Sequence, residues 1–475
     1  MRRGGATASR EDECAGKNDP PMHRVTLRDL AAALKPRDVV NDAPVEIAEL
    51  AYDTRAVTSG SLFFCLRGAH ADGHALAPAA AAAGAAALVV ERRLDVPLPQ
   101  LVVEDSRAAM APAATVFYGD PTRELEVAAV TGTNGKTTTA FLLHAILVAA
   151  GRRTGLLTNI ERLVAGEERP TGLNTPEAID LQRLFREMRD GGDDACVMEA
   201  TSIAQVEGRL AGTRFAVLVF TNLTQDHLDY HGTMEAYYEA KRALFAQAEA
   251  AVVNVGNEYG RRLASELPGA ITFDGDADIL DGVELKLRGA FNRANAAGAA
   301  LAARALGADD DAVRRGIESL DGVPGRFESI EEGQPFAVIV DYAHTPDSLE
   351  NVMRTARGLG ERLVVVFGAG GDRDRAKRPL MGRVVAELAD RAILTSDNPR
   401  SEDPEAIIRA VRGDLTTDFH VEVDRRAAIE RALREARPGD VVVLAGRGAE
   451  PEQELASGKI PFDDRDVARE ILKAL

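Results

Sequence analysis

The segment that most constrains this chain is residues 131–137, which read Thr-Gly-Thr-Asn-Gly-Lys-Thr directly after the apolar run 127–130. A glycine-rich turn that leaves a strand and opens a helix points several backbone N–H groups at one spot, where the helix dipole adds positive potential. Residues 138–150 are apolar at helical spacing, as such a unit requires. The pattern predicts a phosphate-binding loop in which Lys136 reaches the β- and γ-phosphates and the hydroxyl of Thr137 binds Mg²⁺.

The match to the general phosphate-loop pattern is incomplete, because Val130 stands five residues before Gly135, where a glycine is expected. The alternative interpretation is an ordinary glycine-containing turn between a strand and a helix. Turn chemistry alone gives no reason for Gly-Lys-Thr-Thr-Thr at a helix start, so we favour the nucleotide-binding interpretation.

Apolar runs alternate with helical stretches along most of the 475 residues, and this alternation divides the chain into three blocks. Continuous apolar strands between helices indicate α/β domains built on parallel sheets. Pro324-Gly325 marks a hinge before the third block. The predicted organisation is a disordered tail over 1–22, followed by domains over 23–122, 123–322 and 323–475.

The same patterns predict individual elements. The first block contains a helix over Leu27–Leu34 and an alanine-rich helix that ends at 86–90. Two later helices cover 234–245 and 292–306. The predicted strands of the second and third blocks are 127–130, 154–158, 195–198, Phe215–Phe220, 251–255, 336–340, 363–367, 392–394 and 441–444.

Charge and cysteine content exclude several classes of function. The net charge of −18 offers no basic footprint for nucleic acid, so any site for an acidic nucleotide must gather its lysines and arginines locally. Cys14, Cys65 and Cys196 lie far apart and are odd in number. We therefore expect buried small side chains in a reducing compartment rather than disulfides or a zinc site.

The apolar runs are too short or too interrupted for a membrane span, and residues 1–21 lack the apolar core of a signal peptide. These features predict a cytoplasmic protein without a membrane span. Ordered patterning begins at His23, so Met22 is a candidate for the true start.

Polar clusters follow the apolar strands of the second and third blocks. Because ligands in open α/β sheets bind beyond the carboxyl ends of the strands, the two sheets should present functional edges to one cleft. The clusters are 131–137, Glu199, Thr221-Asn222, Asp341–His344, 368–373, 397–400 and 446–448.

Two residues of the second block are candidate metal ligands. Glu199 ends a strand, and His227 lies in the polar run 221–231; oxygen ligands with one imidazole suit Mg²⁺ or Mn²⁺. For Asp229 and His231 a polar surface loop is an equally good interpretation. Lys241 falls on a predicted helix, where a solvated charge is the ordinary interpretation.

The third block gathers Arg373, Arg375, Lys377 and Arg378 in one short segment. In an acidic chain this cluster should serve something anionic, and bidentate arginine–carboxylate pairing is the obvious use. The alternative is a solvated helix start.

Taken together, these motifs resemble the Mur ligase family, and within it the UDP-N-acetylmuramoyl-L-alanyl-D-glutamate ligases (the MurE type), which add the third peptide residue. The resemblance covers about 23–473 and includes Tyr52-Asp-Thr-Arg55, Asp72-Gly-His74, 131–139, Asn174-Thr-Pro-Glu177, Met198-Glu199, 220–245, Phe291-Asn-Arg-Ala-Asn295, Pro324-Gly-Arg-Phe-Glu328, 341–346, 370–381, 397–400 and Pro461-Phe-Asp-Asp-Arg465. It implies an α/β protein with an N-terminal UDP-binding domain, a central P-loop ATPase-like parallel sheet and a C-terminal Rossmann-like domain.

The resemblance also implies an activity and its cofactors. The carboxylate of the UDP-sugar dipeptide attacks the γ-phosphate of ATP, and the amine of the incoming amino acid displaces phosphate from the acyl-phosphate. Positioning and electrostatic clamps supply most such catalysis. ATP and Mg²⁺, as two ions, are the implied cofactors, with Lys136, Glu199, His227 and Lys241 as catalytic residues.

Site residues carry over from the resemblance position by position. ATP would be bound by Gly132, Thr133, Asn134, Gly135, Lys136, Thr137 and Thr138, with Asn295 on adenine, Arg326 on the nucleotide and Asp341 on the ribose. The metal ligands would be Thr137, Glu199, His227 and Lys241, the last as a carbamate (N6-carboxylysine). Contacts to the UDP-muramoyl-dipeptide would come from Thr54, Asn174, Thr175, Ser202 and Arg209. The amino-acid pocket would comprise Arg373, Asp397, Asn398, Pro399, Arg400, Gly446 and Glu450.

Asp-Asn-Pro-Arg at 397–400 resembles the enzymes that add meso-diaminopimelate, in which arginine pairs with the distal carboxylate. A lysine-adding enzyme would leave a buried Arg400 unpaired, which is costly. We therefore expect meso-diaminopimelate, with L-lysine or another diamino acid as the alternative.

Two positions depart from the family pattern. Thr201-Ser202-Ile203 stands where Ser-Ser-His is usual, and Gly446-Arg-Gly-Ala-Glu450 stands where Gly-Lys-Gly-His-Glu is usual. The first puts dipeptide contacts in doubt, and the second reshapes the amino-acid pocket. Neither touches the phosphate or metal residues, so we expect ligase activity to survive.

Two other functions compete with this interpretation. Folylpolyglutamate synthetase is a ligase of the same superfamily, but it lacks a UDP-binding domain such as 23–122. A non-catalytic paralogue that binds UDP-sugars would not need the complete set Lys136, Glu199, His227 and Lys241. The expected partners are small-molecule substrates only, for a monomer in cell-wall and cell-division metabolism.

Overall fold

The structure is a computed structural model that describes residues 25–68, 71–275, 278–416 and 419–475. The expected disorder over 1–22 and the candidate start at Met22 lie outside these ranges. The chain forms two compact units, one up to Ala109 and one from Met110 to Leu475. Each unit is described by itself.

The first unit is built on one mostly parallel sheet. Within its described residues the strand order is β1-β5-β4-β3-β2, with only β1 antiparallel to its neighbour. The strands are β1 (Asp38–Val40), β2 (Glu49–Ala51), β3 (Ser61–Phe64), β4 (Ala85–Val90) and β5 (Gln100–Val102). The helices are α1 (Leu27–Leu34), capped by Thr26, and α2 (Ala77–Ala82).

One sequence prediction in this unit was wrong. The alanine-rich segment was expected to stay helical to 86–90, but helix α2 ends at Ala82 and β4 follows. Leu88, Val89 and Val90 are fully buried. A short apolar run buried on both faces has no periodicity that separates strand from helix, which is why the sequence pattern misled.

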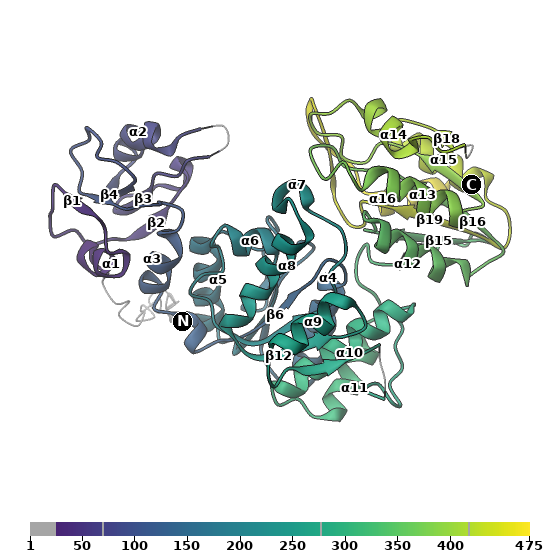
Figure 1. The fold of residues 1–475 in the computed structure, drawn as a ribbon, viewed down its shortest axis with the longest axis horizontal. Helices are drawn as coiled ribbons and strands as arrows, with labels where there is room; N and C mark the ends of the chain where they lie inside the picture. The colour runs from purple at the N-terminus through teal and green to yellow at the C-terminus, as the bar shows by residue number, and fades with distance from the viewer. Residues whose placement is uncertain (1–24, 69–70, 276–277, 417–418) are drawn as a thin grey trace, which may run out of the picture. The chain divides into compact units, whose positions relative to one another are not determined.

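The second unit contains two parallel-rich sheets, of which the larger carries the phosphate loop (Figure 1). In the described residues its order is β13-β12-β11-β6-β10-β7-β8-β9, and only the last two pairings are antiparallel. Its strands are β6 (Glu126–Thr131), β7 (Thr154–Leu157), β8 (Arg162–Val164), β9 (Glu167–Glu168), β10 (Ala195–Glu199), β11 (Phe215–Phe220), β12 (Ala248–Asn254) and β13 (Ile271–Phe273).

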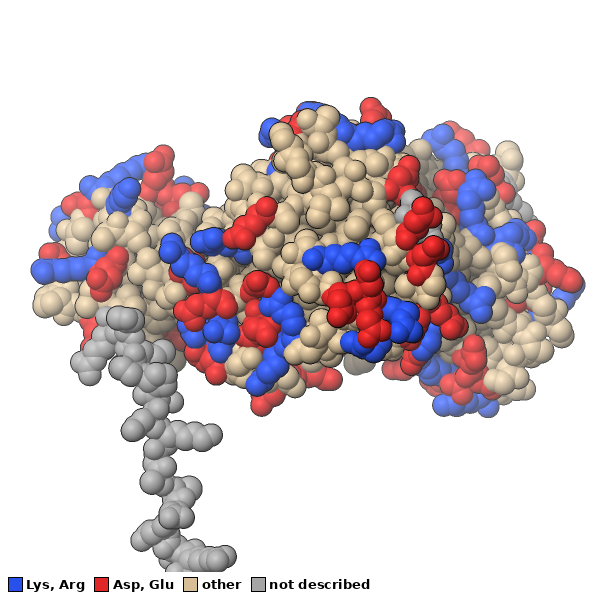
Figure 2. Space-filling view, turned by 90° about the horizontal axis from the view of Figure 1, so that it is seen from below, with Lys and Arg blue, Asp and Glu red and all other residues tan. Residues whose placement is uncertain are grey.

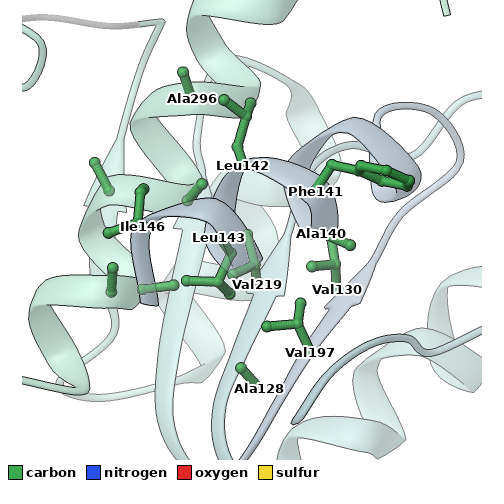
Figure 3. Close-up of a cluster of buried hydrophobic side chains, with 14 of the residues drawn as sticks. Ala128, Val130, Ala140, Phe141, Leu142, Leu143, Ile146, Val197, Val219 and Ala296 are labelled. Atoms are coloured by element: carbon green, nitrogen blue, oxygen red, sulfur yellow. The ribbon is translucent and has the colours of Figure 1, made fainter. Parts of the chain in front are cut away.

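Helices cover both faces of this sheet. On one face α4 (Lys136–Ala149) packs with α10 (Ala290–Ala305) and α11 (Asp310–Ser319). Figure 3 shows Leu142, Leu143 and Ile146 of α4 among side chains of the sheet and of α10. On the other face lie α5 (Ala178–Asp190), α6 (Ser202–Val206), α8 (Met234–Arg242) and α9 (Glu258–Glu266). Two further helices are α3 (Met110–Phe117) and α7 (Leu228–His231).

The smaller sheet has the described order β14-β15-β19-β16-β17-β18, with only β14 antiparallel. Its strands are β14 (Glu328–Ser329), β15 (Ala337–Asp341), β16 (Arg362–Phe367), β17 (Arg391–Leu394), β18 (His420–Val421) and β19 (Asp440–Ala445). The helices are α12 (Pro346–Arg357), α13 (Arg378–Leu388), α14 (Pro404–Arg412), α15 (Arg425–Glu435) and α16 (Asp464–Lys473). A hairpin of β20 (Glu452–Leu455) and β21 (Gly458–Pro461) follows β19.

The predicted α/β class is confirmed, and each strand predicted in the second and third blocks is present to within a few residues. The domain boundaries at 122/123 and 322/323 stay predictions. In the described part of the chain, no helix is long and apolar enough to cross a membrane. Acidic and basic side chains lie next to one another on the face drawn in Figure 2.

Candidate active site

The phosphate loop lies between the end of β6 and the start of α4, and its backbone is packed too closely for side chains at two positions. A Cβ on Gly132, whose φ is +150°, would lie 1.9 Å from Thr221 Oγ1. A Cβ on Gly135, with φ +86°, would lie 2.3 Å from Asn295 Oδ1. Both positions therefore require glycine.

Residues after β11 hold this loop in shape. The N–H of Asn134 donates to Asn222 Oδ1 at 2.9 Å, and the Thr221 hydroxyl donates to the Asn134 carbonyl at 2.6 Å. The N–H of Thr133 donates to the Asn222 carbonyl at 2.9 Å. The pair Thr221-Asn222, singled out from the sequence as a polar cluster, thus positions the loop.

Lys136 begins α4 and bends back over the loop. Its Nζ donates to the carbonyls of Gly132 and Thr133 at 3.0 and 2.8 Å. Burial lowers the pKa of this amine, while the carboxylates of Glu199 and Asp226 act in the opposite direction. An ammonium held by these two neutral carbonyls can turn to an anion placed over the loop.

Thr137 links Glu199, at the end of β10, to Arg326, which lies far along the chain. Its hydroxyl donates to Glu199 Oε1 at 2.7 Å and accepts from Arg326 Nη2 at 3.1 Å. The Arg326 guanidinium lies over the ring of Tyr342, with 4.2 Å from Cζ to the ring centroid. Its buried Nη1 has no hydrogen-bond partner among the described residues, which leaves a donor for an anion.

A pocket of about 210 Å³ opens beside this cluster. It brings together most of the residues predicted for the nucleotide, together with the metal candidate Glu199. Those that line it are Thr133, Asn134, Gly135, Lys136, Thr137, Thr138, Glu199, Asn295, Arg326 and Asp341. Asn174, which was predicted for the dipeptide, lines the same pocket. Gly132 lies directly before them at the end of β6.

Asp341, at the end of β15, is the buried carboxylate of this pocket. Its Oδ2 accepts from the N–H of Phe327 at 2.7 Å. Burial raises its pKa to about 6, although the charge of Arg326 and two backbone N–H groups act against the rise. An ionised carboxylate here is an acceptor for hydroxyl groups of a ligand.

Lys241, on α8, is not the solvated charge that its helix position suggested. It is 1% exposed, and its Nζ donates to the Gly132 carbonyl at 2.9 Å and lies 4.8 Å from the centroid of the Tyr237 ring. Burial and the neighbouring charge of Lys136 hold its pKa well below the usual range for lysine. Burial therefore favours the neutral amine, which is a nucleophile, over the cation expected on a surface helix.

His227 sits in a left-handed conformation (φ +54°) beside the buried Asp226. The Asp226 carboxylate lies 2.9 Å from Lys377 Nζ, 3.4 Å from His227 Nε2 and 3.6 Å from His344 Nε2. Burial lowers the pKa of His227 to about 3, so its imidazole is neutral and can offer a lone pair. Asp229 is exposed and has no comparable surroundings.

Asp226 was missed by the sequence analysis. Burial by itself would raise its pKa, but a hydrogen bond with His344 and the charge of Lys377 hold it well below the usual range. Its partners lie more than a hundred residues further along the chain, so no local spacing could have found it. Its place directly before His227 was the one available signal.

Three of the residues predicted for the dipeptide, Thr175, Ser202 and Arg209, lie near the carboxyl end of β10. Thr175 Oγ1 donates to the Glu199 carbonyl at 2.9 Å, and Arg209 Nη1 donates to the Thr175 carbonyl at 3.3 Å. Ser202 Oγ lies 2.9 Å from His231 Nε2. His231 therefore contacts this cluster rather than standing free on the surface. Thr54 belongs to the first unit, in the short 3-10 helix Thr54–Ala56.

Most residues predicted for the amino-acid pocket lie in the segments after β17 and β19. Asn398 Nδ2 donates to Glu450 Oε2 at 2.7 Å, and the Tyr342 hydroxyl donates to Glu450 Oε1 at 3.2 Å. Asp397 is buried, and its Oδ2 has no hydrogen-bond partner in the described part of the chain. A Cβ on Gly446 (φ +118°) would lie 2.4 Å from this oxygen. Pro399 is buried between Asn398 and Arg400.

Arg400 departs from the expectation. Its Nε donates to Glu454 Oε2 at 2.9 Å and its Nη1 to the Gly371 carbonyl at 2.7 Å. The premise that Arg400 lacks a partner without a distal substrate carboxylate was therefore wrong. The β20–β21 hairpin, which the sequence analysis did not consider, supplies that partner.

The basic cluster at the start of α13 serves carboxylates of the protein itself. Arg378 is 2% exposed and donates to both oxygens of Glu402 at 3.0 and 2.8 Å, so a solvated helix start is wrong for this residue. These hydrogen bonds lower the pKa of Glu402 to about 2. Lys377 pairs with Asp226, whereas Arg373 and Arg375 are exposed.

A phosphate loop whose pocket is completed by a second α/β sheet defines an enzyme that handles a nucleoside triphosphate. Three family models match: "Mur ligase family, catalytic domain" over residues 46–120, "Mur ligase middle domain" over 130–280, and "Mur ligase, glutamate ligase domain" over 325–448. The chain belongs to the Mur ligase family.

Individual proteins extend this likeness over most of the chain. A relative from Geobacillus kaustophilus, named UDP-N-acetylmuramoyl-L-alanyl-D-glutamate--2,6-diaminopimelate ligase, is 45% identical over 90% of this chain and 95% of its own length. A solved structure of a protein of that name is 32% identical, with a TM-score of 0.61 over 90% of this chain and 95% of that one. A MurF ligase from Thermotoga maritima in complex with ADP is 19% identical with a TM-score of 0.61, covers 90% of this chain and 97% of that one, and shares the fold.

Proposed function

We propose that this chain is the ATP-dependent ligase that joins meso-diaminopimelate to UDP-N-acetylmuramoyl-L-alanyl-D-glutamate in peptidoglycan precursor synthesis. One observation carries the proposal. A chain 45% identical over nine tenths of its length to a relative of that name places its phosphate loop, Arg326 and Asp341 around one pocket of about 210 Å³. The C–N bond is formed at the expense of the terminal phosphate of ATP.

The first step is transfer of the γ-phosphoryl group. A carboxylate oxygen of the dipeptide attacks the γ-phosphorus, the bond to the β–γ bridging oxygen breaks, and ADP leaves. Lys136, the N–H groups of the loop and the free donor of Arg326 stabilise the charge that develops on the phosphate oxygens. Asn295 and Asp341 hold the adenosine, with the Asp341 carboxylate accepting from ribose hydroxyls.

The oxygen-rich surroundings of Thr137 fit Mg²⁺. Thr137 and Glu199 present hard oxygen ligands 2.7 Å apart, and His227 adds a neutral imidazole. No group of three or more acidic, histidine or cysteine side chains among the described residues could enclose a metal by itself. Thr137, Glu199 and His227 would hold Mg²⁺ together with the nucleotide, and bound Mg²⁺, as two ions, would neutralise charge on the phosphates.

The buried amine of Lys241 suits carbamylation. A neutral amine adds to the carbon of CO₂ and loses a proton, which replaces a buried neutral amine beside Lys136 with an anion. The product gives Lys241 an oxygen ligand for Mg²⁺. The negatively charged carbamate would also pair with the positive charge of Lys136 inside the site.

The second step is attack of the amino acid on the acyl-phosphate. The amine nitrogen bonds to the carbonyl carbon, the tetrahedral intermediate loses inorganic phosphate, and the amine loses a proton. Thr175, Ser202, Arg209 and Asn174 hold the dipeptide. Asp397, Asn398 and Glu450 receive the far end of the amino acid. Asp397 Oδ2, which has no hydrogen-bond partner among the described residues, suits an ammonium group. The pocket is completed by Arg373, Pro399, Arg400 and Gly446.

The test is phosphate release from ATP with the UDP-muramoyl-dipeptide and a panel of meso-diaminopimelate, L-lysine and folates. We expect turnover with meso-diaminopimelate and a higher kcat/KM for it than for L-lysine. A higher kcat/KM for L-lysine would contradict the choice of amino acid. Turnover with folates, or with none of the panel, would contradict the activity itself.

The chain acts as a monomer in the cytoplasm, and the free, buried Cys65 and Cys196 suit a reducing compartment.

A further inference from the structure

A cluster of fully buried charges contacts residues of the proposed amino-acid pocket. The side chains of Arg425, Arg447 and Asp464 are all 0% exposed. Arg425 Nε donates to Asp464 Oδ1 at 2.8 Å, and Arg447 Nε lies 3.8 Å from the same carboxylate oxygen. Buried charges are expensive unless they are paired, so this arrangement needs a structural or functional reason.

Arg447 distributes its donors over three separate segments. Nη1 donates to Asn398 Oδ1 at 2.6 Å, and Nη2 donates to the carbonyls of Glu452 and Phe462 at 2.7 and 3.1 Å. Glu452 begins β20 and Phe462 follows the end of β21. One guanidinium therefore ties both ends of the hairpin to the segment after β17.

The hairpin in turn clamps that segment. Gln453 Nε2 donates to the Asp397 carbonyl at 2.6 Å, and the N–H of Glu454 donates to Asn398 Oδ1 at 2.9 Å. Arg400 donates to the Glu454 carboxylate. The pocket residues 397–400 are thus held by a hairpin that Arg447 anchors.

The contact with Asn398 fixes the direction of its amide. Asn398 Oδ1 accepts from both Arg447 and the Glu454 N–H, so its Nδ2 must point the other way, where it donates to Glu450 Oε2 at 2.7 Å. The charge of Arg447 lies only 3.7 Å from that same Glu450 oxygen. Arg447 therefore acts on Glu450 both through the amide and through its charge.

We propose that Arg447 is a positioning residue for the amino-acid substrate: it fixes the Asn398 amide and the Glu450 carboxylate without itself reaching the ligand. The inference rests on the proposed function, because the pocket is assigned to the amino acid there. Affinity for the amino acid then depends on a side chain that is completely enclosed. ATP and the UDP-sugar bind through other residues and should not depend on it.

Substitution of Arg447 separates this role from a general loss of structure. Arg447→Met keeps the length and removes every donor; Arg447→Lys keeps the charge but loses the planar fork that reaches three acceptors. Arg426 directly follows the buried Arg425, but it is exposed and pairs with the exposed Glu470. Arg426→Met is therefore the matched control. Steady-state phosphate release gives kcat and the three KM values for each variant.

In Arg447→Met we expect KM for meso-diaminopimelate to rise about tenfold or more, with KM for ATP and for the UDP-sugar unchanged within about twofold. Arg447→Lys should lie between this variant and the unsubstituted protein, and Arg426→Met should match the latter. An unchanged KM for the amino acid would overturn the inference, as would an equal rise in all three KM values. If Arg447→Met does not fold, Arg447→Lys decides by the same criterion.

The pH profile gives a second readout that a structural role would not move. Without Arg447 the pKa of Glu450 should rise, and the acid limb of kcat/KM for the amino acid should shift to higher pH. The groups that face Glu450 are Tyr342, His344, Asp397, Asn398, Arg425 and Arg447. An unshifted limb would count against the charge effect. If the unsubstituted protein turns over no amino acid at all, the proposed function fails instead.

Discussion

At the scale of single residues, Lys241 shows how enclosure changes the chemistry of a side chain. Its position on a helix suggested a solvated cation, yet it is 1% exposed and lies beside a second lysine. Nothing in the local sequence signals this burial, because it depends on Gly132 and Tyr237, which come from other elements. The resemblance to the Mur ligases, and not the pattern, pointed to this residue.

We expect Lys241→Ala to lower kcat by about 100-fold or more, because a metal ligand is removed from the proposed phosphoryl-transfer site. Added acetate or formate should restore part of the activity by placing a carboxylate in the vacated space. Phosphate release with and without these acids measures both effects. Lys286→Ala, which removes an exposed ion pair with Asp321, is the control. Full activity of Lys241→Ala without rescue would remove the lysine from the mechanism.

Asp341 links nucleotide binding to pH. Because burial raises its pKa to about 6, the carboxylate is protonated below that pH and loses acceptor capacity for the ribose hydroxyls that we propose it binds. We therefore expect KM for ATP to rise as pH falls below about 6 and to level off above it. Asp341→Asn should have a raised KM that no longer varies with pH in this range. The same pH dependence in the variant would show that another group titrates.

The folded state binds the proton on Asp341 more tightly than the unfolded chain does, since its pKa is raised from 3.8 to about 6. The contribution of this group to stability is therefore complete below about pH 3.8 and is lost as the pH rises through about 6. At neutral pH the ionised carboxylate is a cost to folding that its proposed role at the nucleotide explains.

At the scale of elements, α4 and α11 approach each other unusually closely. A Cβ on Gly316 of α11 would lie 2.4 Å from the Cα of Ile146, a backbone atom of α4 that no rotamer change can move. Ile146 is among the buried side chains drawn in Figure 3. The phosphate loop sits at the start of α4, so this contact helps to fix the helix that presents it.

Substitution of Gly316 by alanine should therefore destabilise the second unit, even though alanine is the better helix former. We expect a net loss of about 1–3 kcal/mol, because the overpacking cost exceeds the gain in helix propensity. Gly322→Ala is a control, since a Cβ there meets nothing within 4 Å. Thermal unfolding measures both. A melting temperature that is unchanged or higher in Gly316→Ala would mean that the helices separate at no cost.

Elements with strong local signals were predictable from the sequence, and the one clear error has a physical reason. The strands around the phosphate loop are short, apolar and bounded by turn residues, so their existence and type followed from pattern alone. The helix prediction for Ala85–Val90 was wrong because alanine favours a helix, while burial between β3 and β5 favours a strand. Tertiary surroundings decided that case.

At the scale of the whole molecule, the candidate site is assembled from residues that are distant in the sequence. Thr137 meets Arg326, Asn134 Nδ2 donates to Asp347 Oδ2 at 2.8 Å, and Asp226 meets Lys377. The sequence predicted one cleft from the rule that ligands bind at carboxyl ends of strands. It could not predict which side chains pair across the cleft, nor that Arg400 would pair with Glu454.

The nucleotide pocket lies wholly within the second compact unit, whereas Thr54 belongs to the first. We therefore expect residues 110–475, produced alone, to fold and to bind ADP within about threefold of the affinity of the full chain, since no pocket contact is removed. The fragment should release no phosphate, because it lacks the proposed UDP contacts. Calorimetry with ADP and the phosphate assay test the two parts.

A Lys136→Ala version of the fragment, which should lose ADP binding, is the control for specificity. If the fragment is folded by circular dichroism yet does not bind ADP, the first unit must contribute to the nucleotide site.

The two cysteines of the described chain have a practical consequence. Cys65 and Cys196 are both buried, and burial raises the pKa of the Cys65 thiol to about 12 and that of the Cys196 thiol further still. Thiols so protected stay unreactive toward maleimide dyes. Once Cys14 is replaced by serine, a cysteine introduced at an exposed position such as Val206, 56% exposed, would accept a fluorophore against a dark background. Two such labels, one in each compact unit, would report their separation by energy transfer as the substrates are added in turn.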